Sequence, residues 1–221
     1  MQNDIKKNFT IKRLLNTILT VSIFVIAISL SNPLVVVAAD SEPEVVLKKG
    51  VNSIVEVLND NKFSDPSQKN ARKDILFNIA ETFFDFNEFS RGALGQNWRR
   101  FSNVQQSEFS KHFARLMANT YIAKIDDENF KDLKITYTKT EIIDATKSGI
   151  ERAEISTEVF HNNVVTPVHY RMMKKSGGSW KIYDVKIEGV SLVGNYREQY
   201  RTRFNDPPEK IIQEIKDKVA Q

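Results

Sequence analysis

The sequence contains no cysteine, and this absence excludes several kinds of chemistry at once. Without thiols there can be no disulfide, no thiolate nucleophile, no zinc–thiolate site and no redox centre. Only three histidines occur, and no H-E-x-x-H, calcium-loop or glycine-rich phosphate-binding motif accompanies them. The sequence therefore predicts no metal, no nucleotide and no cofactor, and without disulfides the fold must be stabilised by its apolar core alone.

Net charge is also small once the first 39 residues are set aside. The whole chain carries a formal net charge of +4. Residues 1–39 contain four basic residues and one acidic residue, a net +3 that leaves only +1 for residues 40–221. Nucleic-acid binders need a strong basic excess, so we expect no nucleic-acid partner.

The first 39 residues have the three parts of a secretory signal. Basic residues precede an uncharged apolar run at 14–30, and Val37 and Ala39 occupy the small-residue positions of a cleavage site. We expect cleavage between Ala39 and Asp40, which would leave residues 40–221 as one exported domain. The alternative is an uncleaved membrane anchor, because the apolar run is close to the shortest length that spans a bilayer.

Helical periodicity dominates the first half of the chain after this signal. Apolar residues recur at helical spacing in 42–60 and 64–84, and a short aromatic helix is expected within 84–102, ended by Gly95. Ser102 and Gln105 have the spacing of a capping box, which predicts the start of a long amphipathic helix. Two further helices are expected after Gly189.

From about residue 133 the apolar period changes to two, which predicts four strands within 132–144, 150–160, 164–175 and 180–190. Their short connections predict antiparallel pairing. Around the last loop we expect Lys175 to face Trp180 and Arg171 to face Asp184.

The second hairpin and the two faces of the sheet follow from the same pattern. We expect a four-residue loop at 160–163, which sets Val159 opposite Val164 and Ile155 opposite Val168. One face should be apolar and the other polar, with His169, Arg171 and Asp184 on the polar side.

The fold class that follows is α+β. We expect a single domain in which about six to seven helices cover one face of a curved four-stranded antiparallel sheet. Fourteen phenylalanines, most of them in the helical half, are usually plain core. Collectively they could also line a deep hydrophobic pocket between the helices and the sheet.

Two groups of residues invite an enzymatic interpretation. Gly189–Val193 reads GVSLV, which lacks the last glycine of a hydrolase nucleophile elbow, and the expected sheet is antiparallel rather than parallel. Ser191 is better explained as the cap of the following helix. His169 and Asp184 lie on adjacent strands and could form the dyad of a cone-shaped enzyme fold, but on the outward polar face.

Two motifs resemble those of MlaC-type proteins. FDFNEFSRGALGQNWRR (84–100) is similar to the DF-x-x-(F/M)-(S/A)-x-x-x-LG-x-x-W motif of that family, and WKIYDVKIEGVSLVGNYREQY (180–200) is similar to its YD-V-x-I-EG-VSL-x-x-NYR signature. The resemblance implies a soluble periplasmic phospholipid carrier, not an enzyme, that helps to maintain outer-membrane lipid asymmetry. The implied partners are phospholipid as cargo, an outer-membrane lipoprotein–porin complex and an inner-membrane ABC transporter with an MCE-domain ring. A non-carrying adaptor between these complexes remains an alternative.

The expected lipid-binding residues combine the apolar stripe of the long helix, the apolar face of the sheet and the start of the next helix: Phe109, Phe113, Met117, Tyr121, Ile155, Val168, Tyr170, Met172, Tyr183, Val185, Ile187, Leu192 and Tyr196. Three arginines, Arg99, Arg100 and Arg197, are expected at a rim that meets a head group or a partner.

Overall fold

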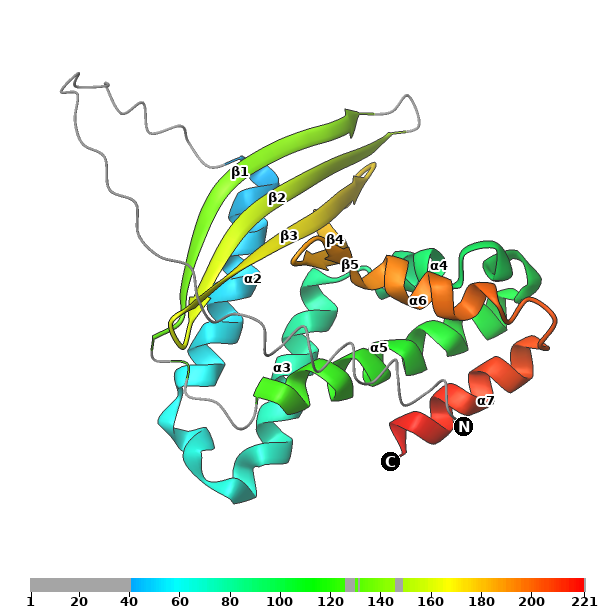
Figure 1. The fold of residues 1–221 in the computed structure, drawn as a ribbon, viewed down its shortest axis with the longest axis horizontal. Helices are drawn as coiled ribbons and strands as arrows, with labels where there is room; N and C mark the ends of the chain where they lie inside the picture. Colours follow the sequence, from blue (N-terminus) through cyan, green and yellow to red (C-terminus); the bar gives the residue numbers. More distant parts are fainter. Residues whose placement is uncertain (1–40, 126–129, 131, 146–148, 221) are drawn as a thin grey trace. The chain divides into compact units, whose positions relative to one another are not determined.

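The chain folds into helices, then a sheet, then helices again, in a computed structural model that describes residues 41–125, 130, 132–145 and 149–220 (Figure 1). The expected signal segment lies outside these residues. The helical elements of the first half are α2 (Glu42–Asn59), η1 (Asn61–Ser64), η2 (Pro66–Gln68), α3 (Lys69–Phe83), α4 (Phe86–Leu94), η3 (Gly95–Arg100) and α5 (Asn103–Ile125). The remaining elements are β1 (Lys134–Ala145), β2 (Ile150–His161), β3 (Val164–Lys175), β4 (Lys181–Ile187), β5 (Val190–Ser191), α6 (Leu192–Arg201) and α7 (Pro208–Val219).

The predicted α+β class is confirmed. The strands form one antiparallel sheet in the order β1-β2-β3-β4-β5. The fifth strand was not expected. Glu188 and Gly189 adopt positive φ angles of 51° and 80°, so a two-residue turn folds Val190 back onto Ile187 before α6 begins.

Local signals in the sequence explain where the helices start and stop. Ser102 and Gln105 form the expected capping box at the start of α5: the Ser102 amide donates to Gln105 Oε1 at 2.8 Å, and the Gln105 amide donates to Ser102 Oγ at 3.3 Å. Asp85 caps α4 by accepting the Glu88 amide at 3.0 Å. Gly95 ends α4 with a φ of 57°, which a residue with a Cβ adopts only at a cost.

The hairpin between β2 and β3 differs from the prediction. Val159 lies opposite Thr166 and Ile155 opposite Tyr170, because the turn contains only Asn162 and Asn163. Both asparagines have positive φ, 49° and 62°, the conformation of a type I′ hairpin turn. The four-residue loop was therefore wrong, but the register moves by two residues, so every side chain stays on its predicted face.

The hairpin between β3 and β4 contains a β-bulge. Arg171 lies opposite Asp184 as predicted, but the register then shifts and Met172 lies opposite Ile182. Tyr183 is the extra residue, so it has no partner in the ladder. The predicted pairing of Lys175 with Trp180 is wrong for the same reason.

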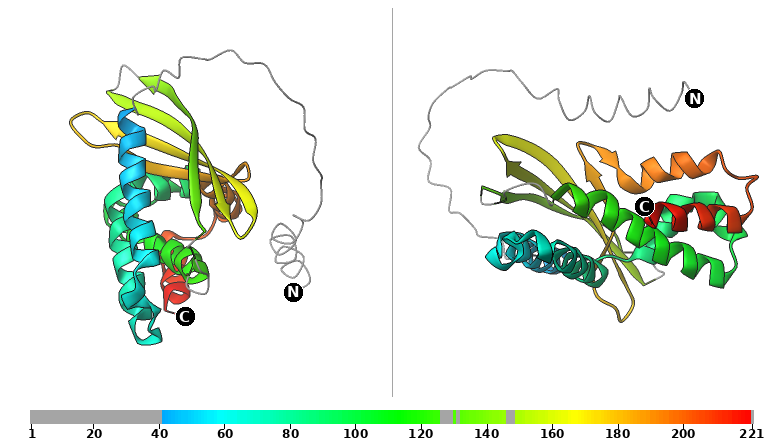
Figure 2. Two further views of the ribbon diagram at one scale, coloured as in Figure 1. Left: turned by 90° about the vertical axis from the view of Figure 1, so that its left-hand side faces the viewer. Right: turned by 90° about the horizontal axis from the view of Figure 1, so that it is seen from below.

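Helix α2 crosses β1, β2 and β3 on one face of the sheet (Figures 1 and 2). Buried Leu47 enters the apolar face, and Thr140 of β1 donates to Glu44 of α2 at 2.7 Å. Helix α3 packs closely on α2 because Gly50 has no side chain: a Cβ there would lie 2.8 Å from the Phe83 ring. Helix α3 also contacts α5, where Arg115 bonds to Asp74 at 3.4 Å, so α3 lies between α2 and the remaining helices.

The other four helices form a separate group. Helix α5 lies beside α7, and α4 lies beside α6 (Figure 1). This group is joined to the sheet between α3 and α4, where the Asp85 amide donates to the Ile182 carbonyl at 2.8 Å and Phe84 forms an isolated bridge with Ile182. A second connection is the direct passage of the chain from β5 into α6.

The two-residue turn gives a stability prediction. Asn163→Ala should lower the free energy of unfolding by about 1 kcal/mol, because a left-handed conformation costs an ordinary residue about 1–2 kcal/mol. Asn163→Gly should not destabilise, since glycine adopts positive φ freely. Urea unfolding of both variants checks this, and equal stabilities would contradict the turn.

Candidate functional site

Most of the buried apolar side chains in the described ranges form two clusters. The helical cluster contains Phe89, Ala93, Leu94, Phe101, Phe109, Phe113, Met117, Val193, Tyr200, Ile211, Ile212 and Ile215. The sheet cluster contains Leu47, Ala153, Ile155, Val168, Met172, Trp180, Ile182 and Val185. Two partly buried residues, Phe84 and Leu192, pack against both. A domain of this size usually has one contiguous core, so this division needs an explanation.

The residues expected in a lipid pocket are divided between the two clusters. Phe109, Phe113 and Met117 belong to the helical cluster, and Tyr121 and Tyr196 pack at its margin. Ile155, Val168, Met172 and Val185 belong to the sheet cluster, and Tyr170 and Ile187 pack at its margin; Leu192 contacts both clusters.

Four of the expected pocket residues are completely enclosed by other side chains. Phe109, Phe113, Ile155 and Met172 have 0% exposure, so none has surface to offer a ligand in this structure. The Phe109 and Phe113 rings stack on one another at 5.3 Å, and both lie edge-on to Tyr200 of α6. These four residues fill the core in this structure, and their place on the wall of a lipid pocket stays a prediction.

Three tyrosines at the cluster margins behave differently. Tyr121, Tyr170 and Tyr196 each keep some accessible surface. Burial nevertheless raises the pKa of all three phenols, that of Tyr121 to about 12, with a smaller contribution from nearby Tyr196. Each of these tyrosines is therefore partly accessible, while protein atoms surround much of its side chain and disfavour the charged phenolate.

Each cluster has two such rings close together. Tyr121 lies near Tyr196 at the margin of the helical cluster. Tyr137 of β1, a residue missed in the sequence because the register of that strand was not predicted, lies near Tyr170 at the margin of the sheet cluster. Aromatic rings with one polar end are common where an apolar surface is incompletely covered.

Tyr183 does not lie on the apolar face, contrary to the prediction. The bulge turns its side chain to the outer face of the sheet, where it lines a cleft of about 400 Å³ with Arg171 and Asp184. The strict alternation that placed it beside Val185 does not hold across an extra residue.

The outer cleft brings together five arginines from five elements. Its lining comprises Glu88, Arg91, Gly92, Gly95, Trp98, Arg99, Arg152, Arg171, Met173, Tyr183, Asp184, Ser191, Val193 and Arg197. Arg99 and Arg197, two of the three residues expected at a rim, are therefore neighbours here. The Arg197 Nε donates to the Gly92 carbonyl at 2.8 Å, which holds α6 against α4.

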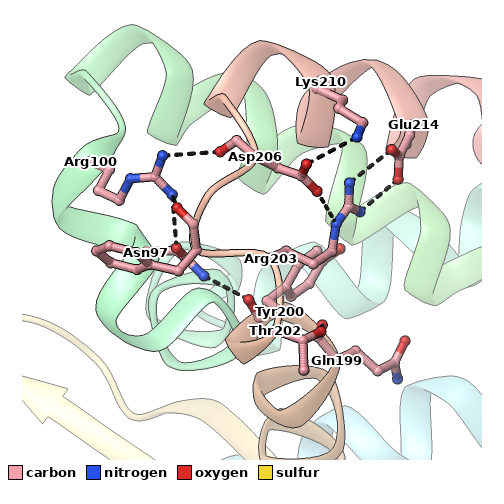
Figure 3. A network of polar contacts seen from close by, with 10 residues as sticks. Asn97, Arg100, Gln199, Tyr200, Thr202, Arg203, Asp206, Lys210 and Glu214 are labelled. Atoms are coloured by element: carbon pink, nitrogen blue, oxygen red, sulfur yellow. Dashed lines mark hydrogen bonds and ion pairs between the residues drawn. The ribbon is translucent and has the colours of Figure 1, made fainter.

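Arg100, the third expected rim residue, has a structural role instead (Figure 3). Its guanidinium donates to the carbonyls of Phe204 and Asp206, the latter at 3.0 Å, and to Asn97 Oδ1 at 3.2 Å. It thereby binds the loop between α6 and α7 to η3. These contacts use the guanidinium, so Arg100 is not available to a head group or a partner.

The same loop is held by a second arginine (Figure 3). Arg203 forms two bonds with Glu214 of α7, at 2.6 and 2.8 Å, and a third with Asp206 at 2.8 Å. The residues of this network lie partly buried, so their ion pairs are better shielded from water than exposed pairs.

The candidate catalytic groups are engaged in structural bonds. Ser191 caps α6 by accepting the Gly194 amide at 2.8 Å, as expected, and donates to Asp184 at 2.7 Å. Asp184 also accepts the Val193 amide at 3.1 Å. His169 Nδ1 instead lies 2.9 Å from Ser156 Oγ. His169 and Asp184 therefore bond to different partners and do not form a dyad.

The described ranges contain neither a candidate metal site nor a candidate membrane span. No cluster of three His, Asp or Glu side chains there could hold a metal ion. Of the helices α2 to α7, none combines the length and the apolar character that a membrane span requires.

Comparisons with known proteins found a family model, a curated relative and a solved structure that are similar to this chain. The family model described as "MlaC protein" matches residues 48–217. The toluene tolerance protein Ttg2D of Pseudomonas putida is 26% identical over 170 residues, which are 76% of this chain and 75% of that protein. A phospholipid-binding protein from Ralstonia solanacearum, solved in complex with a phospholipid, superposes with a TM-score of 0.65 at 20% identity, over 82% of this chain and 98% of that one. The similarity to the Ralstonia structure shows a shared fold.

The neighbouring arginines Arg99 and Arg100 give a matched test of the loop contacts. Arg100→Ala should lower the free energy of unfolding by about 1–2 kcal/mol, because it leaves two loop carbonyls without their donor. Arg99→Ala should change it little, since the exposed Arg99 side chain has no bond to any described residue. Thermal unfolding measures both, and an equal loss in the two variants would refute the structural role of Arg100.

Proposed function

Because the chain belongs to the MlaC protein family, whose model matches most of its length, we propose that it is a carrier that binds phospholipid. The structural observation that supports the proposal is that each apolar cluster has partly accessible tyrosine side chains at its margin, Tyr121 and Tyr196 on the helical cluster and Tyr170 on the sheet cluster. The Ralstonia protein that shares the fold was solved with a phospholipid, which supports the same conclusion.

The physical requirement for such a carrier is enclosure of the lipid tails. Burial of each methylene contributes about 0.8 kcal/mol, so one acyl chain of about 16 carbons contributes roughly 12 kcal/mol. A protein that only touched the tails would gain little of this favourable free energy of burial. A space between two apolar layers meets the requirement, because both sides of a tail then contact apolar groups.

The proposed binding surface is smaller than the sequence predicts. It comprises the margin residues that keep accessible surface, Tyr121 and Tyr196 on the helices and Tyr170 and Ile187 on the sheet, with Leu192 between them. Met117, Val168 and Val185 are buried and lie behind this surface. Phe109 and Phe113 of α5 lie behind the proposed binding surface and support it, but they do not form part of it.

The arrangement also allows release of the lipid. Among the described residues, the two clusters have Phe84 and Leu192 as common packing residues, so few apolar contacts oppose a movement of the helical group away from the sheet. A carrier needs this property because its cargo has to leave as well as enter.

The cellular role that fits this chemistry is transport across the periplasm. We infer that the protein is exported by residues 1–39 and exchanges phospholipid between an outer-membrane lipoprotein–porin complex and an inner-membrane ABC transporter with an MCE-domain ring, which maintains outer-membrane lipid asymmetry. The family relation supports this role. A non-carrying adaptor would need no accessible surface inside its apolar interior, and an enzyme using His169 and Asp184 would need a dyad.

Lipid extraction tests the proposal. Protein expressed from the full chain and purified without detergent should release phospholipid into an organic solvent in stoichiometric amount, as measured by mass spectrometry. Protein that is folded but yields no phospholipid would favour the adaptor.

A matched pair of variants tests the location of the lipid. Val159→Glu places a carboxylate at the margin of the sheet cluster, where burying a charge beside lipid tails is costly, and should reduce bound phospholipid several-fold. Val165→Glu makes the same change on the exposed outer face of the next strand, where Val165 is 52% exposed, and should retain the lipid. Equal lipid content in both variants would place the binding surface elsewhere.

A further inference from the structure

The outer cleft concentrates positive charge in a chain that is otherwise nearly neutral. Five arginines line it against two carboxylates, Glu88 and Asp184. Residues 40–221 together carry only +1, so the surplus of three charges at the cleft is balanced by an acidic excess elsewhere on the protein. A concave surface lined by one sign of charge focuses the field and attracts groups of the opposite sign.

The two carboxylates do not neutralise the whole cleft. Asp184 is 2% exposed, and its oxygens are occupied by Ser191, the Val193 amide and Arg171. Glu88 pairs with Arg91 and with Lys175, which approaches it to 3.2 Å. Both carboxylates are thus already bonded to other protein groups. They do not neutralise the other arginines of the cleft, which remain able to bind an anion.

Two of the remaining arginines have no carboxylate partner. Arg99 is exposed and bonds to no described residue, and the Arg197 Nε bonds to the neutral Gly92 carbonyl. A guanidinium presents five donors in a planar fork that matches a carboxylate. Arg171 illustrates this chemistry at the edge of the cleft, where it bonds to Glu154 at 2.8 Å.

The uncharged residues that line the cleft include types that are common in protein–protein interfaces. The cleft contains Trp98, Tyr183 and Met173 beside its arginines, and it contains no lysine. Tryptophan, tyrosine and arginine dominate the residues that contribute most to protein–protein binding, and methionine is also enriched there, whereas lysine is depleted. We therefore propose that the outer cleft binds an acidic segment of a partner protein through Arg99, Arg197 and the neighbouring arginines.

The position of the cleft makes this site independent of the proposed lipid surface. Arg171 and Asp184 are an opposed pair on the outer face of β3 and β4, whereas Val168, Met172 and Val185 point into the sheet cluster on the other face. A partner can therefore occupy the cleft while the space between the apolar clusters is filled or empty.

A labelled oligoglutamate peptide is a suitable probe. The protein, expressed from the full chain, should bind the peptide in a fluorescence anisotropy titration, and the affinity should fall as salt is added because exposed charges are screened. Arg99→Glu should weaken binding roughly tenfold, since it replaces an attractive charge in the cleft by a repulsive one.

Arg201→Glu is the matched control. Arg201 lies on α6, where it is 70% exposed, pairs with Glu198 and does not line the cleft. This variant has the same net charge as Arg99→Glu and should bind the peptide within about twofold of the wild type, because its charge is solvated and screened. Circular dichroism and thermal unfolding check that both variants are folded.

Three outcomes would overturn the proposal. The wild-type protein could fail to bind oligoglutamate, or the two variants could lose affinity equally, which would show attraction to net charge alone. The third is binding to phosphatidylglycerol vesicles, with no binding to the peptide, that is lost in Arg99→Glu. That result would assign the cleft to a membrane surface instead of an acidic protein segment.

Discussion

The structure depends on a division of its apolar interior into a helical cluster and a sheet cluster that are joined by only two common residues, Phe84 and Leu192. Phe84 holds its position because the adjacent Asp85 amide bonds to Ile182 of β4. Leu192 holds its position because it is the first residue of α6, which Ser191 caps directly after β5. Both connections are therefore fixed by backbone geometry.

The division into two clusters leaves tyrosine side chains at the margin of each. Tyr121 and Tyr170 keep some accessible surface there, although burial raises the pKa of both phenols. The polar side chains that stabilise helix ends and loops lie away from this region. Ser191 and Asp184 cap a helix, and Arg100 and Arg203 hold the loop between α6 and α7 (Figure 3). The interior between the clusters thus retains an apolar character suited to lipid tails.

Much of this fold could be predicted from the sequence because its signals are local. The capping box at Ser102 and the alternation of the strands each depend on residues close together in the chain. Prediction failed where a single residue changed the geometry. Two asparagines with positive φ shortened a hairpin loop, and one extra residue moved Tyr183 to the other face of the sheet.

Apolar periodicity also could not separate residues that fill the core, such as Phe109, from residues that keep accessible surface, such as Tyr121, because both lie on the same helix face. The adjacent Arg99 and Arg100 likewise look equivalent in sequence, and only the tertiary contacts assign one to the cleft and the other to a loop.

The central claim is that lipid tails occupy the space between the two clusters. A crystal structure of the protein purified without removal of bound lipid tests it most directly. The account predicts continuous acyl-chain density in contact with Tyr170 from the sheet and Tyr196 from α6. Side chains of the two clusters closing on one another, with that space filled and any lipid bound only on the outer surface, would contradict it.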